Sequence, residues 1–123
     1  MSENLYDIYL LEFQHAAQNC IHRNKNLLDS LSKHENAASR ISRAIIKAST
    51  QCGCISLCGK KEEIPTTQIS GEICTDCREI IENEIGEELF YLAAIASAFD
   101  ISLYDILLRE RKKLEILGKF SLK

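Results

Sequence analysis

The sequence predicts an all-α protein in which a cysteine-rich loop separates two pairs of helices. Two observations lead to this class. Apolar residues recur at helical spacing on both sides of one segment, and that segment holds the only proline, Pro65, and five of the six cysteines. A chain of 123 residues is long enough to bury a core of its own. We therefore expect a single helical domain over residues 1–123, built as a four-helix bundle.

The first half of the chain predicts two helices, over residues 4–31 and 33–49. Neither range contains a proline or a glycine, and SLSKHEN, residues 30–36, is the expected turn between them. The apolar positions on one face are Phe13, Ala16, Ala17, Cys20, Leu27, Leu28 and Leu31 in the first helix, and Ala37, Ala38, Ile41, Ala44, Ile45 and Ala48 in the second. Small side chains in the second helix favour close approach of a neighbouring helix.

The second half predicts two more helices, over residues 72–99 and 102–117, after a loop over 50–71. Apolar residues continue at the helical period from Ile73 to Phe99. Ser102 followed by Asp105 is typical of a helix N-terminus, because the serine accepts a free backbone N–H and the acid favours the helix dipole. Gly118 predicts the end of the last helix.

Composition and charge narrow the function classes. The chain is 46% hydrophobic and 27% charged, as in ordinary globular proteins, and its formal charge of −3 gives no signal for nucleic-acid binding. No apolar run reaches the length of a membrane span, and the N-terminus lacks signal-peptide features, so we expect a cytoplasmic protein without a membrane partner. In a reducing cytosol, clustered cysteines are more often metal ligands or redox groups than disulfides.

The cysteines form two closely spaced pairs, Cys52-x-Cys54 and Cys74-x-x-Cys77. Two such pairs predict a structural Zn²⁺ site in which four thiolates surround the ion, a zinc knuckle between the second and third helices. A dithiol redox pair, an iron–sulfur cluster and the absence of any ion remain open. Cys58 is a surplus thiol that either replaces Cys54 or lies near the site without binding. Cys20 is interpreted as a small core residue.

A second group of candidate residues is charged. Glu84, Glu87 and Glu88 lie within or beside the apolar arc of the third helix, and Arg40, Arg43 and Lys47 share one edge of the second. Carboxylates in such a position need partners, because an unpaired buried charge is costly. The first interpretation is a set of interhelical ion pairs, and the alternative is a Mg²⁺ or ligand site in which the basic residues contact phosphate.

Residues 84–107, EIGEELFYLAAIASAFDISLYDIL, resemble the second half of the MazG-like all-α nucleoside triphosphate pyrophosphohydrolases. The resemblance implies a MazG-like bundle, a dimer that pairs helices, and acids that hold Mg²⁺ on a nucleotide. Glu84 and Glu87 would stand for the family's E-x-x-D pair, whereas its E-x-x-E on the preceding helix has no counterpart in 33–49. The whole chain, through CGCI, CREIIE, LFYLA and LGKFSL, also resembles a small bacterial family without an assigned function that keeps the cysteine pairs.

Three functions are compatible with these patterns. The favoured one is a zinc-stabilised MazG-like helical module that has lost catalysis and acts in binding, regulation or assembly as a homo-oligomer. The second is a Mg²⁺-dependent pyrophosphohydrolase acting on a nucleotide through Glu84, Glu87 and Glu88. The third is a zinc–thiol redox sensor in which Cys58 serves as a resolving thiol.

Overall fold

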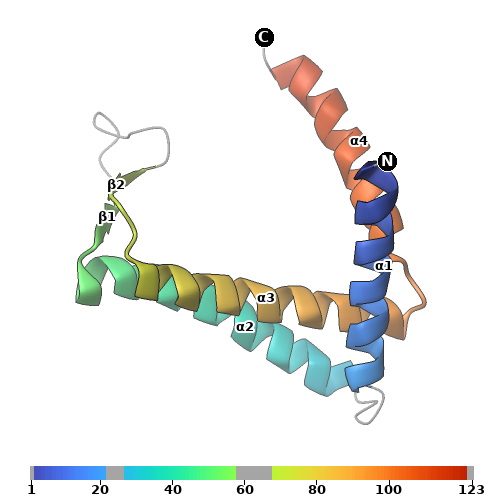
Figure 1. The fold of residues 1–123 in the computed structure, drawn as a ribbon, viewed down its shortest axis with the longest axis horizontal. Helices are drawn as coiled ribbons and strands as arrows, with labels where there is room; N and C mark the ends of the chain where they lie inside the picture. Colours follow the sequence, from blue (N-terminus) through green and yellow to red (C-terminus); the bar gives the residue numbers. More distant parts are fainter. Residues whose placement is uncertain (1, 22–26, 58–67, 122–123) are drawn as a thin grey trace. The chain divides into compact units, whose positions relative to one another are not determined.

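The computed structural model describes residues 2–21, 27–57 and 68–121 (Figure 1). Its elements in chain order are α1 (Ser2–Ile21), α2 (Leu27–Lys47), the π-helical turn η1 (Ala48–Cys52), β1 (Ile55–Leu57), β2 (Ile69–Gly71), α3 (Thr75–Ala98) and α4 (Leu103–Ser121). Most described residues are helical, so the predicted all-α class is confirmed at that level. The short antiparallel pair β1–β2 was not predicted.

The predicted boundary between the first two helices is wrong. We expected one helix over 4–31 and a turn over 30–36, but α1 ends at Ile21 and α2 runs without a break from Leu27 through SLSKHEN. The buried or half-buried positions Ser30, His34 and Ala37 continue the inner face of α2 toward its N-terminus at helical spacing. Because Ser30 and His34 are polar, the apolar pattern breaks at this point, and the break was interpreted as a turn.

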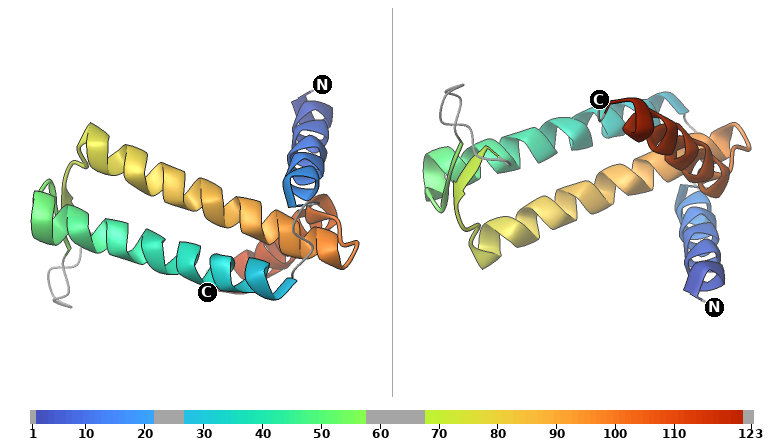
Figure 2. Two further views of the ribbon diagram at one scale, coloured as in Figure 1. Left: turned by 90° about the horizontal axis from the view of Figure 1, so that it is seen from below. Right: turned by 90° about the horizontal axis from the view of Figure 1, so that it is seen from above.

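Contacts between residues divide the chain into two compact units, Met1–Leu31 with Phe90–Lys123, and Ser32–Leu89. In the unit Ser32–Leu89, α2 and α3 run side by side in opposite directions, and the β1–β2 pair lies at the end where α2 finishes and α3 begins (Figures 1 and 2). Both ends of the cysteine-rich segment are therefore anchored on neighbouring helices.

The unit formed by Met1–Leu31 and Phe90–Lys123 contains α1, the start of α2, the last turns of α3, and the whole of α4. The α3 helix ends in a turn in which the N–H of Ile101 donates to the Ala96 carbonyl at 2.9 Å, with Asp100 in the left-handed region at φ 56°. The backbone N–H of Asp105 donates to Ser102 Oγ at 3.4 Å. The predicted cap of the last helix is therefore confirmed.

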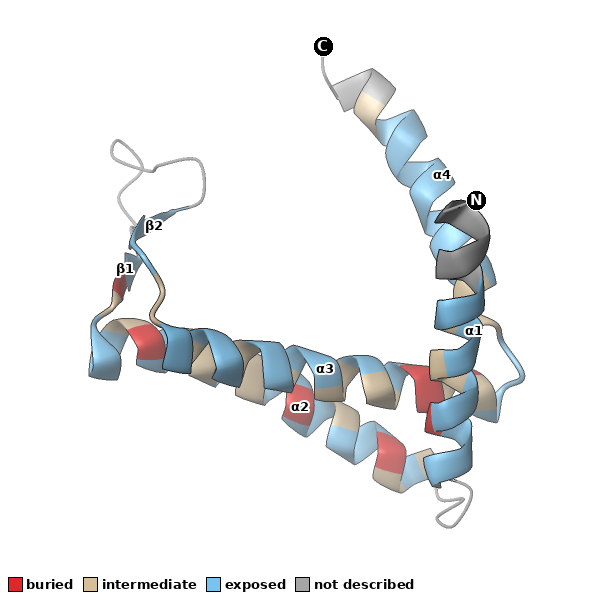
Figure 3. Ribbon diagram, viewed as in Figure 1, coloured by how far each residue is buried: buried red, intermediate tan, exposed pale blue. Residues whose placement is uncertain are grey.

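Few of the described residues are buried (Figure 3), and apart from Ile55 the buried apolar side chains are all alanines. The buried apolar residues are Ala17, Ala37, Ala48, Ile55, Ala93, Ala94 and Ala96. Alanine lets helix backbones approach closely, but it removes little apolar surface from water. Large apolar side chains remain exposed on α3 and α4, including Leu89 at 51% and Leu114 at 61% of their surface.

Among the described helices, none has by itself the length and apolar composition of a membrane span, and only the bent pair Thr75–Ala98 and Leu103–Gly118 meets both criteria when taken together.

Candidate metal centre

Four cysteines meet at one end of the unit Ser32–Leu89. The Sγ atoms of Cys52, Cys54, Cys74 and Cys77 all lie within 4.8 Å of one another. Cys52 is exposed and the other three are half-buried, so the cluster lies just below the surface. These are the four residues that the sequence predicted as zinc ligands.

The first pair of thiols is placed by a turn at the end of η1. Gly53 has a left-handed backbone, with φ 80°, and its N–H donates to the Ala48 carbonyl at 2.9 Å. This conformation suits glycine and reverses the chain between Cys52 and Cys54. The thiol of Cys54 also lies 3.8 Å from the Ala48 carbonyl. The turn therefore directs two side chains that are two residues apart toward the same cluster.

The hairpin brings the second pair to the first. Strands β1 and β2 pair antiparallel, with Ile55 opposite Gly71 and Leu57 opposite Ile69. Strand β1 starts directly after Cys54, and two residues separate Gly71 from Cys74. Cys58 and Pro65 lie outside the described residues.

The second pair opens α3. Cys74 precedes the first helical residue, its carbonyl accepts the N–H of Arg78 at 3.0 Å, and its Sγ accepts the N–H of Cys77 at 3.5 Å. This is the geometry of an N-cap, with sulfur in place of the usual oxygen. The backbone hydrogen bond from Cys77 lowers the pKa of Cys74 to about 7, whereas the interaction with the Cys74 side chain raises the pKa of Cys77 to about 12.

The spacing of the sulfurs fits a single tetrahedral ion. Four sulfurs at about 2.3 Å from a central Zn²⁺ would be about 3.8 Å from each other. The Sγ atoms of Cys52 and Cys74 are 3.8 Å apart, and the widest separation within the set stays below 4.8 Å. The four thiols can therefore hold one metal ion with small adjustments of the side chains.

One of the three predicted basic residues, Arg40 of α2, forms ion pairs with two of the predicted acids of α3, Glu84 and Glu87. Arg40 Nε donates to Glu84 Oε2 at 2.5 Å, and Arg40 Nη2 donates to Glu87 Oε2 at 2.6 Å. These hydrogen bonds, first of all the one to Glu84, raise the pKa of Arg40. Arg43 and Lys47 are exposed and have no ion-pair partner among the residues that the structure describes.

Glu88 pairs with His34, a partner that the sequence analysis missed. His34 lies on the inner face of α2 and, like Arg40, hydrogen-bonds a glutamate of α3. The signal that could have found it is the polar continuation of that face toward the start of α2. Glu88 is 12% exposed and therefore depends on this hydrogen bond more than Glu87, at 45%.

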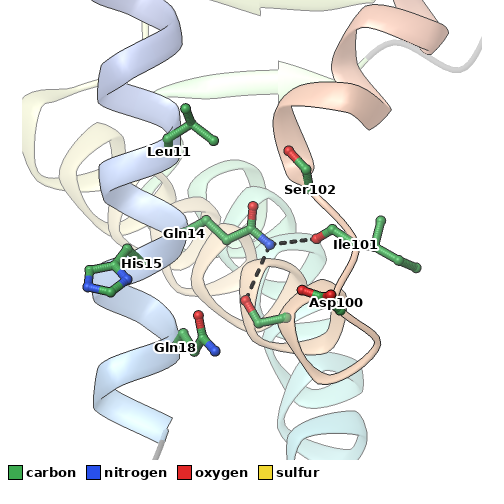
Figure 4. A pocket seen from close by; sticks show the side chains of 8 residues that line it. Leu11, Gln14, His15, Gln18, Asp100, Ile101 and Ser102 are labelled. Atoms are coloured by element: carbon green, nitrogen blue, oxygen red, sulfur yellow. Dashed lines mark hydrogen bonds between the residues drawn. The ribbon is translucent and has the colours of Figure 1, made fainter.

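A second polar constellation, also missed, lies in the other unit. Gln14 of α1 donates to Ser97 Oγ at 3.2 Å and to the Ile101 carbonyl at 2.7 Å (Figure 4). Its Oε1 accepts the N–H of Leu103 at 2.8 Å. It lies beside a cavity of about 230 Å³ that also involves His15 and Asp100. The Gln14 amide donates two hydrogen bonds and accepts one, and these bonds stabilise the turn from α3 to α4, which is a structural role.

Comparison with known proteins finds no matching family model, no similar curated protein and no similar solved structure.

Proposed function

We propose that this chain is a zinc-stabilised helical module that acts through binding or assembly rather than catalysis. The observation that supports it is the set of four sulfurs from Cys52, Cys54, Cys74 and Cys77 within 4.8 Å. Zn²⁺ is bound in structural sites by four ligands that leave no open position for a substrate or water. A site closed by four thiolates stabilises a fold and leaves chemistry to other residues.

The spacing of the sulfurs favours one ion over an iron–sulfur cluster. A cluster places several irons and its own sulfides between the cysteine ligands, which moves the thiolates apart. The 3.8 Å between Sγ of Cys52 and Cys74 is close to the edge of a single tetrahedron of about 3.8 Å for Zn²⁺. The filled d shell of Zn²⁺ adds no geometric preference beyond four-coordination, so the ion suits a site built from a tight turn and a helix N-terminus.

The zinc ion would hold together parts of the chain that otherwise lack a core. Strands of three residues each form a hairpin that is marginal alone in water. Among the apolar side chains of this hairpin, Ile55 is buried, whereas Leu57 and Ile69 are exposed. A metal that bridges Cys52 and Cys54 to Cys74 and Cys77 would fix the loop against the start of α3.

The ion pairs of Arg40 support a non-catalytic function. A Mg²⁺ site requires carboxylate oxygens that are free to bind the ion. Here one guanidinium contacts both Glu84 and Glu87, the two acids that the MazG-like pattern would assign to Mg²⁺. Opening the site would leave Arg40 without its partners, so hydrolysis would have to overcome the loss of both ion pairs.

Assembly with a second copy is the form of binding that α4 favours. All thirteen residues from Asp105 to Leu117 are exposed, although a helix of this length is marginal by itself in water. Leu107 and Leu114 lie one heptad apart, beside Leu117, with 55–61% of their surface exposed. Four basic and three acidic residues nearly balance over this segment, so charge repulsion does not oppose pairing of two copies.

Serine variants of the full chain test the metal function. Cys74→Ser should lose most of the bound zinc when the protein is expressed with zinc and measured by elemental analysis. Cys20→Ser is the matched control, because this cysteine, which the sequence analysis wrongly interpreted as a core residue, is exposed and lies outside the cluster. Cys58→Ser should keep the metal. Equal loss in Cys58→Ser and Cys54→Ser would show that the fourth ligand is wrongly chosen, and zinc-free wild type would contradict the function itself.

A zinc–thiol redox sensor is a second candidate that one observation supports. Cys52 is exposed and its Sγ lies 3.8 Å from that of Cys74, so these two sulfurs are suited to form a disulfide. With hydrogen peroxide as oxidant, the two thiolates would lose two electrons to form the disulfide, the peroxide would take up these electrons and two protons from solvent to give two water molecules, and the zinc would leave. Zinc release by one equivalent of hydrogen peroxide, reversed by a dithiol reductant, would favour this function over a permanently structural site.

A further inference from the structure

Gly71 lies where the two halves of the metal centre come closest. It is the last residue of β2 and is paired with Ile55, the first residue of β1. Cys54 directly precedes Ile55, and Cys74 follows Gly71 after two further residues. The position of Gly71 against β1 therefore determines how near the pair that opens α3 comes to the pair that follows η1.

The backbone leaves no room for a side chain at this position. A Cβ atom added to Gly71 would lie 2.8 Å from the backbone oxygen of Cys54 and 3.6 Å from Cα of Ile55. The first distance is shorter than real Cβ contacts allow, and the atom it meets belongs to the backbone, which cannot rotate away as a flexible side chain can. Gly71 also has φ 90°, in the left-handed region that other residues disfavour.

Two other glycines distinguish the effect of the close contact from that of the left-handed backbone. Gly53 lies between two of the ligands and has φ 80°, but a Cβ there would meet nothing within 4 Å. Gly86, inside α3, has neither a left-handed backbone nor a neighbour within 4 Å. The close approach to a ligand residue is therefore specific to Gly71 among these three glycines.

We infer that Gly71 is a positioning residue of the metal centre, whose missing side chain lets β2 approach Cys54 and sets the distance between the two pairs of thiols. This inference rests on the proposed metal-binding function. A methyl group at position 71 must displace either the Cys54 backbone, and with it one sulfur, or β2, and with it the path to Cys74. Metal–ligand distances in a well-formed site lie within about 0.2 Å of their standard values, so a shift of either pair must be offset by strain elsewhere and weakens binding.

The test compares three variants of the full chain: Gly71→Ala, Gly53→Ala and Gly86→Ala. Zinc affinity is measured by competition with a chelator of known affinity. We expect Gly71→Ala to bind zinc about 10- to 100-fold more weakly than wild type, a loss typical of outer residues that orient metal ligands. Gly53→Ala should lose less, because it carries only the backbone strain, and Gly86→Ala should match wild type.

The visible absorption of bound Co²⁺ gives a readout that a general loss of stability would not move. With a distorted set of ligands, Gly71→Ala at saturating Co²⁺ should show shifted or weakened bands, whereas Gly86→Ala keeps those of wild type. Equal zinc affinity in Gly71→Ala and Gly53→Ala would overturn the inference, as would loss of helical circular dichroism in Gly71→Ala at saturating zinc. Wild type that binds neither metal would overturn the proposed function instead.

Discussion

Cys74 caps α3 with its sulfur: its Sγ accepts the backbone N–H of Cys77 at 3.5 Å, and both residues belong to the cluster of four thiols. The same sulfur that satisfies a free N–H at the start of the helix is also placed to bind a metal. Formation of the helix therefore helps to prepare the thiolate, and a bound metal would in turn fix the start of the helix.

This cap predicts that one thiol ionises early in the metal-free chain. The pKa of Cys74 is lowered to about 7 from its ordinary value of 9.0. Ultraviolet thiolate absorbance of the chelator-treated protein should therefore show a deprotonation near pH 7 that disappears in Cys74→Ser. A titration in which no thiol ionises below the ordinary pKa of 9.0 would contradict the cap.

The same shift fixes the direction of the pH effect on folding. A thiol whose pKa is lower in the folded state stabilises that state fully above pH 9.0, and the contribution is lost as the pH falls through about 7. Cys77, with its pKa raised to about 12, acts in the opposite direction as the pH rises above 9.0. The stability difference between the metal-free wild type and Cys74→Ser should therefore grow from pH 7 to pH 9. A constant difference would argue against the shift.

Gln14→Ala should destabilise the turn from α3 to α4. The substitution removes three hydrogen bonds, to Ser97, Ile101 and Leu103, and each is worth about 1 kcal/mol net. We expect a loss of about 1–3 kcal/mol in the free energy of unfolding, measured with urea. Gln18→Ala, next to the same cavity, is the matched control and should have a small effect. An equal loss of unfolding free energy in the two variants would show that the three hydrogen bonds of Gln14 contribute nothing.

Mg²⁺-dependent pyrophosphate release from common nucleoside triphosphates should be absent, because Arg40 engages both Glu84 and Glu87. The measurement is release of pyrophosphate with saturating Mg²⁺, with zinc content held constant. The opposite account, an active pyrophosphohydrolase, expects turnover that Glu84→Gln and Glu87→Gln abolish while the circular dichroism is unchanged. Such turnover would replace the non-catalytic function with an enzymatic one, whatever the zinc content.

Self-association through α4 should depend on its apolar stripe. Replacing Leu107 and Leu114 together by alanine removes the two exposed side chains that lie one heptad apart, so the dimer should weaken in sedimentation equilibrium of the full chain. Lys112→Ala, on the opposite side of the same helix, should leave the dimer unchanged. A wild-type chain that sediments as a monomer at all accessible concentrations would rule out assembly with a second copy.

The sequence predicted the features that depend on closely spaced residues. Two closely spaced pairs of cysteines predicted the four thiols that meet, and the Ser102–Asp105 pattern predicted the start of α4. Each cysteine pair and the cap are local features, because the spacing along the chain already limits their geometry.

Features that depend on residues distant in sequence were not predictable in the same way. The need for glycine at position 71 follows from its close approach to the Cys54 backbone, which the sequence does not show. The role of His34 likewise depends on its contact with Glu88, 54 positions later. The turn predicted over residues 30–36 failed because polar residues can occupy the inner face of a helix when a neighbouring helix supplies partners.

The most direct test of the metal centre is the metal content of the full chain, expressed and purified without chelators. Elemental analysis and native mass spectrometry should give about one zinc per folded chain, retained in Cys20→Ser and lost in Cys74→Ser. A folded wild type that carries no metal under these conditions, or one that carries an iron–sulfur cluster, would contradict the assignment of Cys52, Cys54, Cys74 and Cys77 as a structural zinc site.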